Sequence, residues 1–120
     1  GNTFVLPMEG YSKKIKTVAE LKDGATIAKH NHQTNHGRAL LMLQKEKLIT
    51  LTADTGLLPT ALDITATPRH QIIMALEGAQ LPPLLDDQKV DVAIISTTYI
   101  QQTGLSPVHD SVFIEDKNSP

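Results

Sequence analysis

The stretch that most constrains the fold runs from Thr26 to Leu43 and reads TIAKHNHQTNHGRALLML. Its first three residues, 26–28, predict a buried strand, and the spacing of Leu40, Leu41 and Leu43 predicts an amphipathic helix. A buried strand that leads into a helix through a polar turn places that turn at the carboxyl edge of an α/β sheet, where such sheets bind ligands. We therefore expect this edge to carry the function.

The turn is rich in side chains that can bind a ligand. It holds three of the chain's five histidines, together with one lysine and one arginine. An asparagine, or the threonine before it, can cap the start of the helix, where free backbone N–H groups and a partial positive charge favour anions. In chain order these side chains are Lys29, His30, His32, Thr34, Asn35, His36 and Arg38.

Composition argues against several classes of protein. The 120 residues suit one domain with a sizeable core. With 11 basic and 13 acidic residues and 3% aromatic residues, the chain lacks the basic surface and stacking platforms of nucleic-acid-binding proteins. No apolar run approaches the roughly 20 residues that span a bilayer, and the start reads as a strand rather than a signal peptide. The chain has no cysteine, and so no thiol nucleophile or anchor cysteine.

The hydrophobic pattern alternates between strands and helices along the rest of the chain. This order predicts an α/β three-layer sandwich with a mostly parallel five-stranded sheet, formed by a single domain over residues 1–120. The first and last strands lie at the chain ends and can lie side by side. The expected strands are 2–6, 25–28, 70–76, 90–95 and 111–115; the expected helices are 17–21, 35–47, 80–87 and 99–102, with a turn at 9–12, a loop at 52–56 and a short helix or turn at 59–64.

Long blocks of the sequence resemble the methionine-binding lipoprotein family (the NLPA group), the substrate-binding components of bacterial methionine ABC importers. These blocks include PMEGYSKKIKTVAELKDGATIA, GLLPTALDI and VDVAIISTTYIQQTGLSP, and together they cover essentially the whole chain. The resemblance implies one flavodoxin-like lobe of a two-lobed periplasmic binding protein, cut at hinge strands near 1–6 and 111–116. The family is found in the cell envelope, but this chain lacks a signal peptide and an anchor cysteine. We therefore expect a soluble recombinant protein.

The resemblance also implies ligand-binding residues. Arg38 matches the arginine of the family's TN-x-GR motif, which grips the ligand carboxylate, and Asn35 is the asparagine of that motif. Ser96 stands where methionine binders usually carry asparagine, so the sequence departs from the family there. Because a single lobe supplies half of the contacts, we expect weak amino-acid binding through Arg38, Asn35, Ser96 and the nearby Lys29.

The turn itself departs most from the family pattern. The family usually has an apolar residue, Pro-Asn-Asp-Pro-Thr-Asn, a second apolar residue and Gly-Arg, whereas this chain has KHNHQTNHGR. Because the change is concentrated at one binding turn, we interpret it as engineering of a stand-alone scaffold.

Three interpretations of the histidine turn stay open. His30, His32 and His36 can bind zinc or another divalent transition metal, although Lys29 and Arg38 would repel a dication. The same two cations and the helix start can instead bind a carboxylate or another anion. In the third interpretation the polar side chains only solvate an exposed cleft, which keeps an isolated lobe from aggregating. A homodimer through the exposed cleft or the hinge strands belongs to the stand-alone scaffold.

A catalytic use of the turn is a further alternative, with His30 or His32 as general base and Arg38 stabilising an oxyanion. The sequence offers no serine or cysteine nucleophile with an obvious base and an orienting carboxylate. We therefore predict that the chain is not an enzyme and assign no catalytic residue.

Overall fold

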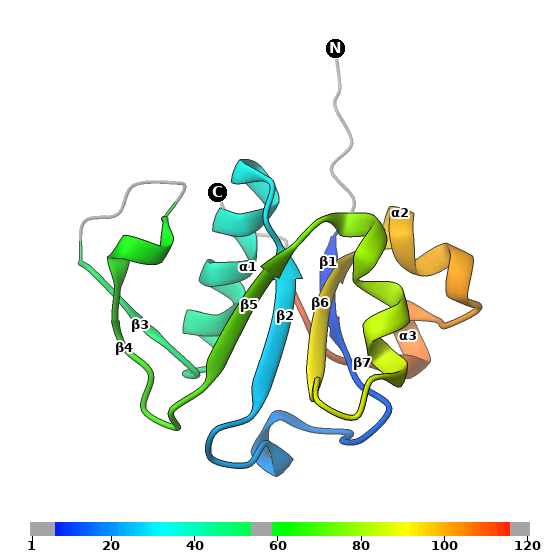
Figure 1. Ribbon diagram of the computed structural model, residues 1–120, viewed down its shortest axis with the longest axis horizontal. Coiled ribbons are helices and arrows are strands. Elements are labelled where there is room, and N and C mark those ends of the chain that lie inside the picture. Colours follow the sequence, from blue (N-terminus) through cyan, green and yellow to red (C-terminus); the bar gives the residue numbers. More distant parts are fainter. Residues whose placement is uncertain (1–6, 54–58, 116–120) are drawn as a thin grey trace.

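A five-stranded sheet forms the centre of the computed structural model, which describes residues 7–53 and 59–115 (Figure 1). Its strands are β1 (Met8–Tyr11), β2 (Thr26–His30), β5 (Ile72–Leu76), β6 (Val92–Ser96) and β7 (Ser111–Ile114). They lie in the order β5-β2-β6-β1-β7. Since only β1 runs antiparallel to its neighbours, four of the five strands point the same way. The fold class predicted from the sequence is confirmed.

The strand and helix around the histidine turn are both present, with shifted ends. β2 extends two residues further than expected, because Lys29 and His30 pair in parallel with β5. Helix α1 (Gln33–Lys45) begins two residues earlier than expected, and just after it Lys47 takes a left-handed conformation with a φ of 64°. The polar turn is therefore only two residues long, at 31–32.

Helices cover both faces of the sheet, so the fold has three layers; Figure 1 shows α1 behind the sheet. Leu40 and Leu43 of α1 share a hydrophobic core with Ile94 of β6. The next residue of β6, Ile95, points to the opposite face and packs with Leu85 in a second core. The short helices on that face are η3 (Gly78–Gln80), η4 (Pro82–Asp86) and α2 (Thr97–Ile100).

The remaining elements are short and lie at the periphery. The predicted helix at 17–21 is present as one 3₁₀ turn, and the predicted short helix at 59–64 is a 3₁₀ turn that leads into a strand. No helix in the described part of the chain is long and apolar enough to cross a membrane. The short peripheral elements are η1 (Val18–Glu20), β3 (Thr50–Leu51), η2 (Ala61–Asp63), β4 (Ile64–Ala66), η5 (Gln101–Thr103) and α3 (Pro107–Asp110).

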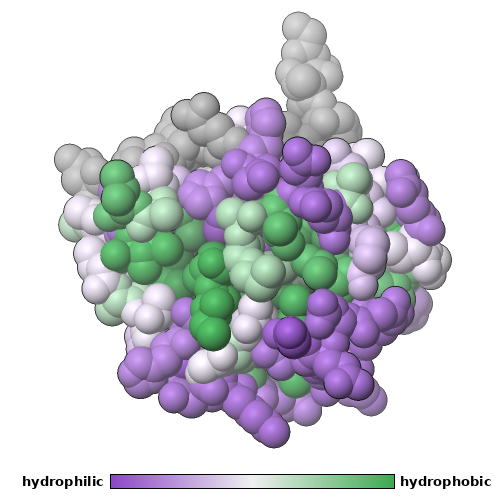
Figure 2. Space-filling model, in the orientation of Figure 1, coloured by the Kyte–Doolittle hydropathy of each residue, from purple (hydrophilic) through white to green (hydrophobic). Residues whose placement is uncertain are grey.

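The edge strand β5 leaves apolar side chains in solvent. Ile72 and Met74, two residues apart on one face, are 54% and 37% exposed. Figure 2 shows hydrophobic surface in this region of the molecule. The predicted strand at 70–76 starts later than expected, because His70 has a φ of 56°, which no strand residue adopts.

One prediction near the start of the chain is wrong. The segment expected to be a turn, 9–12, contains most of β1, which is buried and lies between β6 and β7. Gly10 is needed there for packing, since a Cβ atom would lie 2.5 Å from the ring of Phe113 on β7. The strand predicted at 2–6, the possible hinge remnant at 1–6 and residues 54–56 of the predicted loop lie outside the described residues.

Candidate functional site

Arg38 lies in α1 near the carboxyl edge of the sheet, and among the described residues the side chains of Glu115 and Asn35 hold its guanidinium. Its Nε donates to Oε2 of Glu115 at 2.9 Å and its Nη2 donates to Oε1 at 2.6 Å, which makes a bidentate ion pair. Its Nη1 donates to Oδ1 of Asn35, one turn earlier, at 3.1 Å. The side chains of Arg38 and Glu115 are each 14% exposed. The structure thus brings together two of the predicted ligand residues.

Glu115 is the residue of this site that the sequence did not reveal. It follows β7 directly, and its Oε1 also accepts a hydrogen bond from the backbone N–H of Met8 at 3.1 Å. Its own N–H donates to the carbonyl oxygen of Met8 at 2.9 Å. Only the pairing of β1 with β7 places this carboxylate beside α1, and the sequence showed it merely as the end of a predicted strand.

Lys29, the second predicted cation, is buried rather than exposed. It is 1% exposed, and its Nζ contacts Nδ1 of His36 on α1. The Nζ atom also lies 3.4 Å from the carbonyl oxygen of His30. Desolvation lowers the pKa of Lys29 to about 8, and burial together with the charge of Lys29 lowers the pKa of His36. A neutral His36 therefore accepts the hydrogen bond from the lysine.

His30 points to the opposite face of the sheet from Lys29, because successive strand residues alternate. Its ring centroid lies 5.7 Å from that of Tyr99, and its Nε2 accepts the backbone N–H of Ser96 at 3.1 Å. This bond requires the ring proton to sit on Nδ1 in the neutral form. Burial, helped by nearby cations, lowers the pKa of His30 to about 4, so the ring is neutral at pH 7.

Ser96 lies at the same edge of the sheet as the other predicted ligand residues. It ends β6 and precedes α2, and the side chain is nearly buried. Its backbone N–H is the group that bonds to His30. The four predicted ligand residues therefore share one edge. Lys29 contacts His36 of α1 through its side chain, whereas Ser96 makes its described contact to His30 through its backbone N–H.

The structure does not bring the three histidines together. His30 and His36 lie on opposite faces of the sheet, and His32 is exposed at the N-cap of α1. Within residues 7–53 and 59–115, no group of three His, Cys, Asp or Glu side chains is placed to hold a metal ion. The prediction of a zinc site at His30, His32 and His36 therefore has no geometric support among these residues.

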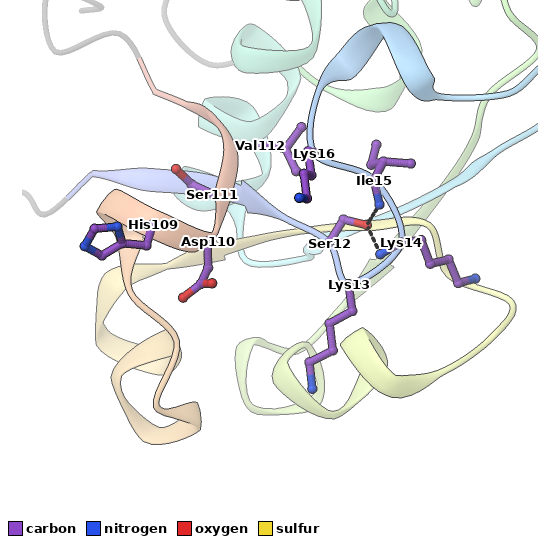
Figure 3. Close-up of a pocket in the computed structure, with 9 residues that line it drawn as sticks. All are labelled: Ser12, Lys13, Lys14, Ile15, Lys16, His109, Asp110, Ser111 and Val112. Atoms are coloured by element: carbon purple, nitrogen blue, oxygen red, sulfur yellow. Dashed lines mark hydrogen bonds between the residues drawn. The ribbon is translucent and has the colours of Figure 1, made fainter.

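A pocket of about 370 Å³ lies at the opposite rim of the sheet, between the segment after β1 and the start of β7 (Figure 3). Lys13 and Lys14 line it, but both ammonium groups face carboxylates outside it. Nζ of Lys13 lies 2.7 Å from Asp86, and Nζ of Lys14 lies 3.8 Å from Asp91. The pocket is remote from Arg38, and the charges of two of its three lysines are offset by these carboxylates, so we place the candidate site at the carboxyl edge.

Comparison with known proteins assigns the chain over its full length. The sequence pattern described as NlpA lipoprotein matches residues 1–120. The chain belongs to the NlpA lipoprotein family. The family resemblance inferred from the sequence blocks is confirmed.

Two curated NlpA relatives and one solved structure place the chain within that family. Lipoprotein 28 of Escherichia coli (strain K12) is 80% identical over 120 residues, which are 100% of this chain and 44% of that protein. The D-methionine-binding lipoprotein MetQ of Salmonella typhimurium is 54% identical over the same 120 residues, again 44% of its length. The crystal structure of the methionine binding protein MetQ matches with a TM-score of 0.94 at 53% identity, covering 100% of this chain and 49% of that one.

The chain thus spans about half the length of the relatives it matches. The names of these NlpA-family relatives describe lipoproteins and binding proteins rather than enzymes, in agreement with the prediction that the chain is not an enzyme.

Proposed function

We propose that this chain is one lobe of a methionine-binding protein of an ABC importer and that Arg38 binds the carboxylate of an amino-acid ligand. The observation that carries this proposal is the guanidinium of Arg38, held by Glu115 and Asn35 at the carboxyl edge of the sheet. An oriented guanidinium suits carboxylates because its N–H groups are arranged in a planar fork. The MetQ relatives, which share this fold, are named for methionine.

The rest of the proposed half-site surrounds Arg38. Asn35 and Ser96 supply polar groups at the same edge, and the buried Lys29 adds a positive charge behind them, where its Nζ contacts His36 of α1. Small-molecule sites enclose most of their ligand, so a single wall binds it roughly millimolar or weaker. For the longer protein we propose a second lobe that supplies the other wall of the site, joined to this one by hinge strands near 1–6 and 111–116. We also propose that the longer protein works with an ABC importer in the cell envelope.

The alternative is a redesigned stand-alone scaffold without a transport function. Lys29 and His36 favour it, because both replace residues that are usually apolar in the family and they contact each other. A histidine-based metal or anion site belongs to this alternative, as does a homodimer through the exposed cleft or the hinge strands. Excess Zn²⁺ raises the melting temperature if the folded protein binds it. An unchanged melting temperature rules out the metal version.

The test of the proposed site is a titration with D- and L-methionine followed by backbone amide NMR. In the wild type we expect shift changes around residues 29–38 and 96–99. Arg38→Ala should abolish them and Arg38→Lys should weaken them, because lysine lacks the planar fork. The control Lys22→Ala removes an exposed cation elsewhere and should titrate like the wild type. Equal titration of wild type and Arg38→Ala would remove Arg38 from the site.

A further inference from the structure

We propose that Glu115 is a positioning residue for Arg38: it holds the guanidinium in the orientation that receives the ligand carboxylate. This inference rests on the proposed function of Arg38 and names a residue that acts through it. Exposed ion pairs usually contribute little because water screens them and both side chains stay mobile. The Arg38–Glu115 pair differs in both respects, since each side chain is only 14% exposed and two N–H groups meet two carboxylate oxygens.

The carboxylate of Glu115 is itself held in place by the sheet. Its Oε1 accepts the N–H of Met8 at 3.1 Å, and the backbone N–H of Glu115 donates to the carbonyl oxygen of Met8 at 2.9 Å. The carboxylate therefore cannot follow a moving arginine without breaking its hydrogen bond to the N–H of Met8 in β1. Through this clamp the start of β1 and the end of β7 fix the direction of a long side chain on α1.

Two effects of Glu115 on an incoming carboxylate oppose each other. Its negative charge repels the ligand, but three N–H donors already share that charge: two from Arg38 and one from Met8. Against this, an arginine that is not held in place has many rotamers, and the ligand must then order it at a cost in affinity. We infer that the second effect is larger, so that Glu115 favours binding.

The substitution Glu115→Gln removes the paired acceptors while nearly preserving the shape of the side chain. A glutamine offers one acceptor oxygen, and its NH₂ group faces the guanidinium with a second donor. We expect methionine binding to weaken about fivefold, the size expected when a ligand must order one long side chain. Glu115→Asp, which keeps the charge but shortens the side chain, should also weaken binding. The matched control is Glu46→Gln, since Glu46 has no described side-chain contact and lies at the far end of α1.

The experiment is a methionine titration of the 120-residue chain and these variants by NMR, which also follows the Nε–H resonance of Arg38. In the ligand-free wild type this resonance should be sharp and protected from exchange, and in Glu115→Gln it should lose that protection while backbone amides elsewhere keep their shifts. A purely structural role would disturb those amides instead. Weaker binding in both Glu115 variants, with wild-type affinity in Glu46→Gln, supports the inference.

Unchanged or tighter binding in both Glu115 variants overturns the inference and leaves the role of Arg38 intact. A wild type that does not bind methionine overturns the proposed function, and the inference with it. The Nε–H resonance of Arg38 separates these cases, because it reports the contact between Arg38 and Glu115 in the absence of ligand.

Discussion

Replacing Lys29 by methionine should stabilise the folded protein, although the substitution removes a hydrogen-bond donor. Lys29 is 1% exposed, and its described polar neighbours are Nδ1 of His36 and the carbonyl oxygen of His30. Among the described residues no carboxylate forms an ion pair with it. Burial of an ammonium group without a carboxylate is costly, and methionine fills a similar volume without the charge.

The magnitude follows from the pKa of Lys29. Desolvation lowers it from 10.5 to about 8 in the folded state. At about 1.4 kcal/mol per pH unit, the ammonium costs about 3 kcal/mol of stability at pH 7. Because the unfolded state binds more protons between pH 8 and pH 10.5, the free energy of unfolding should rise with pH in that window. Below pH 8 the full cost is present, and above pH 10.5 it disappears.

The assay is urea unfolding followed by circular dichroism at pH 7 and pH 9.5, below the range where unfolded tyrosines ionise. The wild type should gain about 2 kcal/mol between these pH values. Lys29→Met should be about 3 kcal/mol more stable than the wild type at pH 7 and should lack this gain. The control Lys22→Met removes an exposed lysine and should shift stability by less than about 0.5 kcal/mol. A Lys29→Met protein that is less stable at pH 7, or that keeps the pH dependence, would refute the reasoning.

Two further substitutions test the packing of β1, both by chemical denaturation. Gly10→Ala should destabilise the fold by about 1–3 kcal/mol, because the new methyl group would meet the ring of Phe113 at 2.5 Å; wild-type stability would show that this contact relaxes freely. Tyr11→Phe removes the hydroxyl that donates to Oε2 of the buried Glu9 at 2.6 Å, which should cost about 1–3 kcal/mol at pH 7. Burial raises the pKa of Glu9, so the deficit should shrink below pH 4.5, where the carboxyl is protonated; an equal deficit at both pH values would contradict this explanation.

Local pattern predicted the elements that carry their own periodicity and missed the one that does not. The β-branched run around Ile94 marked β6 as a strand buried on both faces, and the spacing of Leu40 and Leu43 marked the buried face of α1. Strand β1 contains Gly10 between polar-tipped residues and reads as a turn. Its burial depends on Phe113, 103 positions later, which packs over the glycine. No local pattern can show that contact.

The candidate site likewise has one part that the local sequence predicts and one part that depends on the order of the strands. Asn35 and Arg38 are three residues apart on one helix, so their proximity follows from the helical repeat. Glu115 lies 77 positions from Arg38, and only the order of the strands brings it there. The sequence could not show where the histidines point, because β2 continues through His30 and so sends Lys29 and His30 to opposite faces of the sheet.

The central claim is that the carboxyl edge of this sheet binds an amino acid through Arg38, and a crystal structure of the chain grown with saturating methionine tests it most directly. The expected result is a methionine whose carboxylate lies within hydrogen-bond distance of the Arg38 guanidinium, about 2.7–3.2 Å, with Asn35 and Ser96 beside it. Methionine bound at another surface, or at this edge without touching Arg38, would contradict the account.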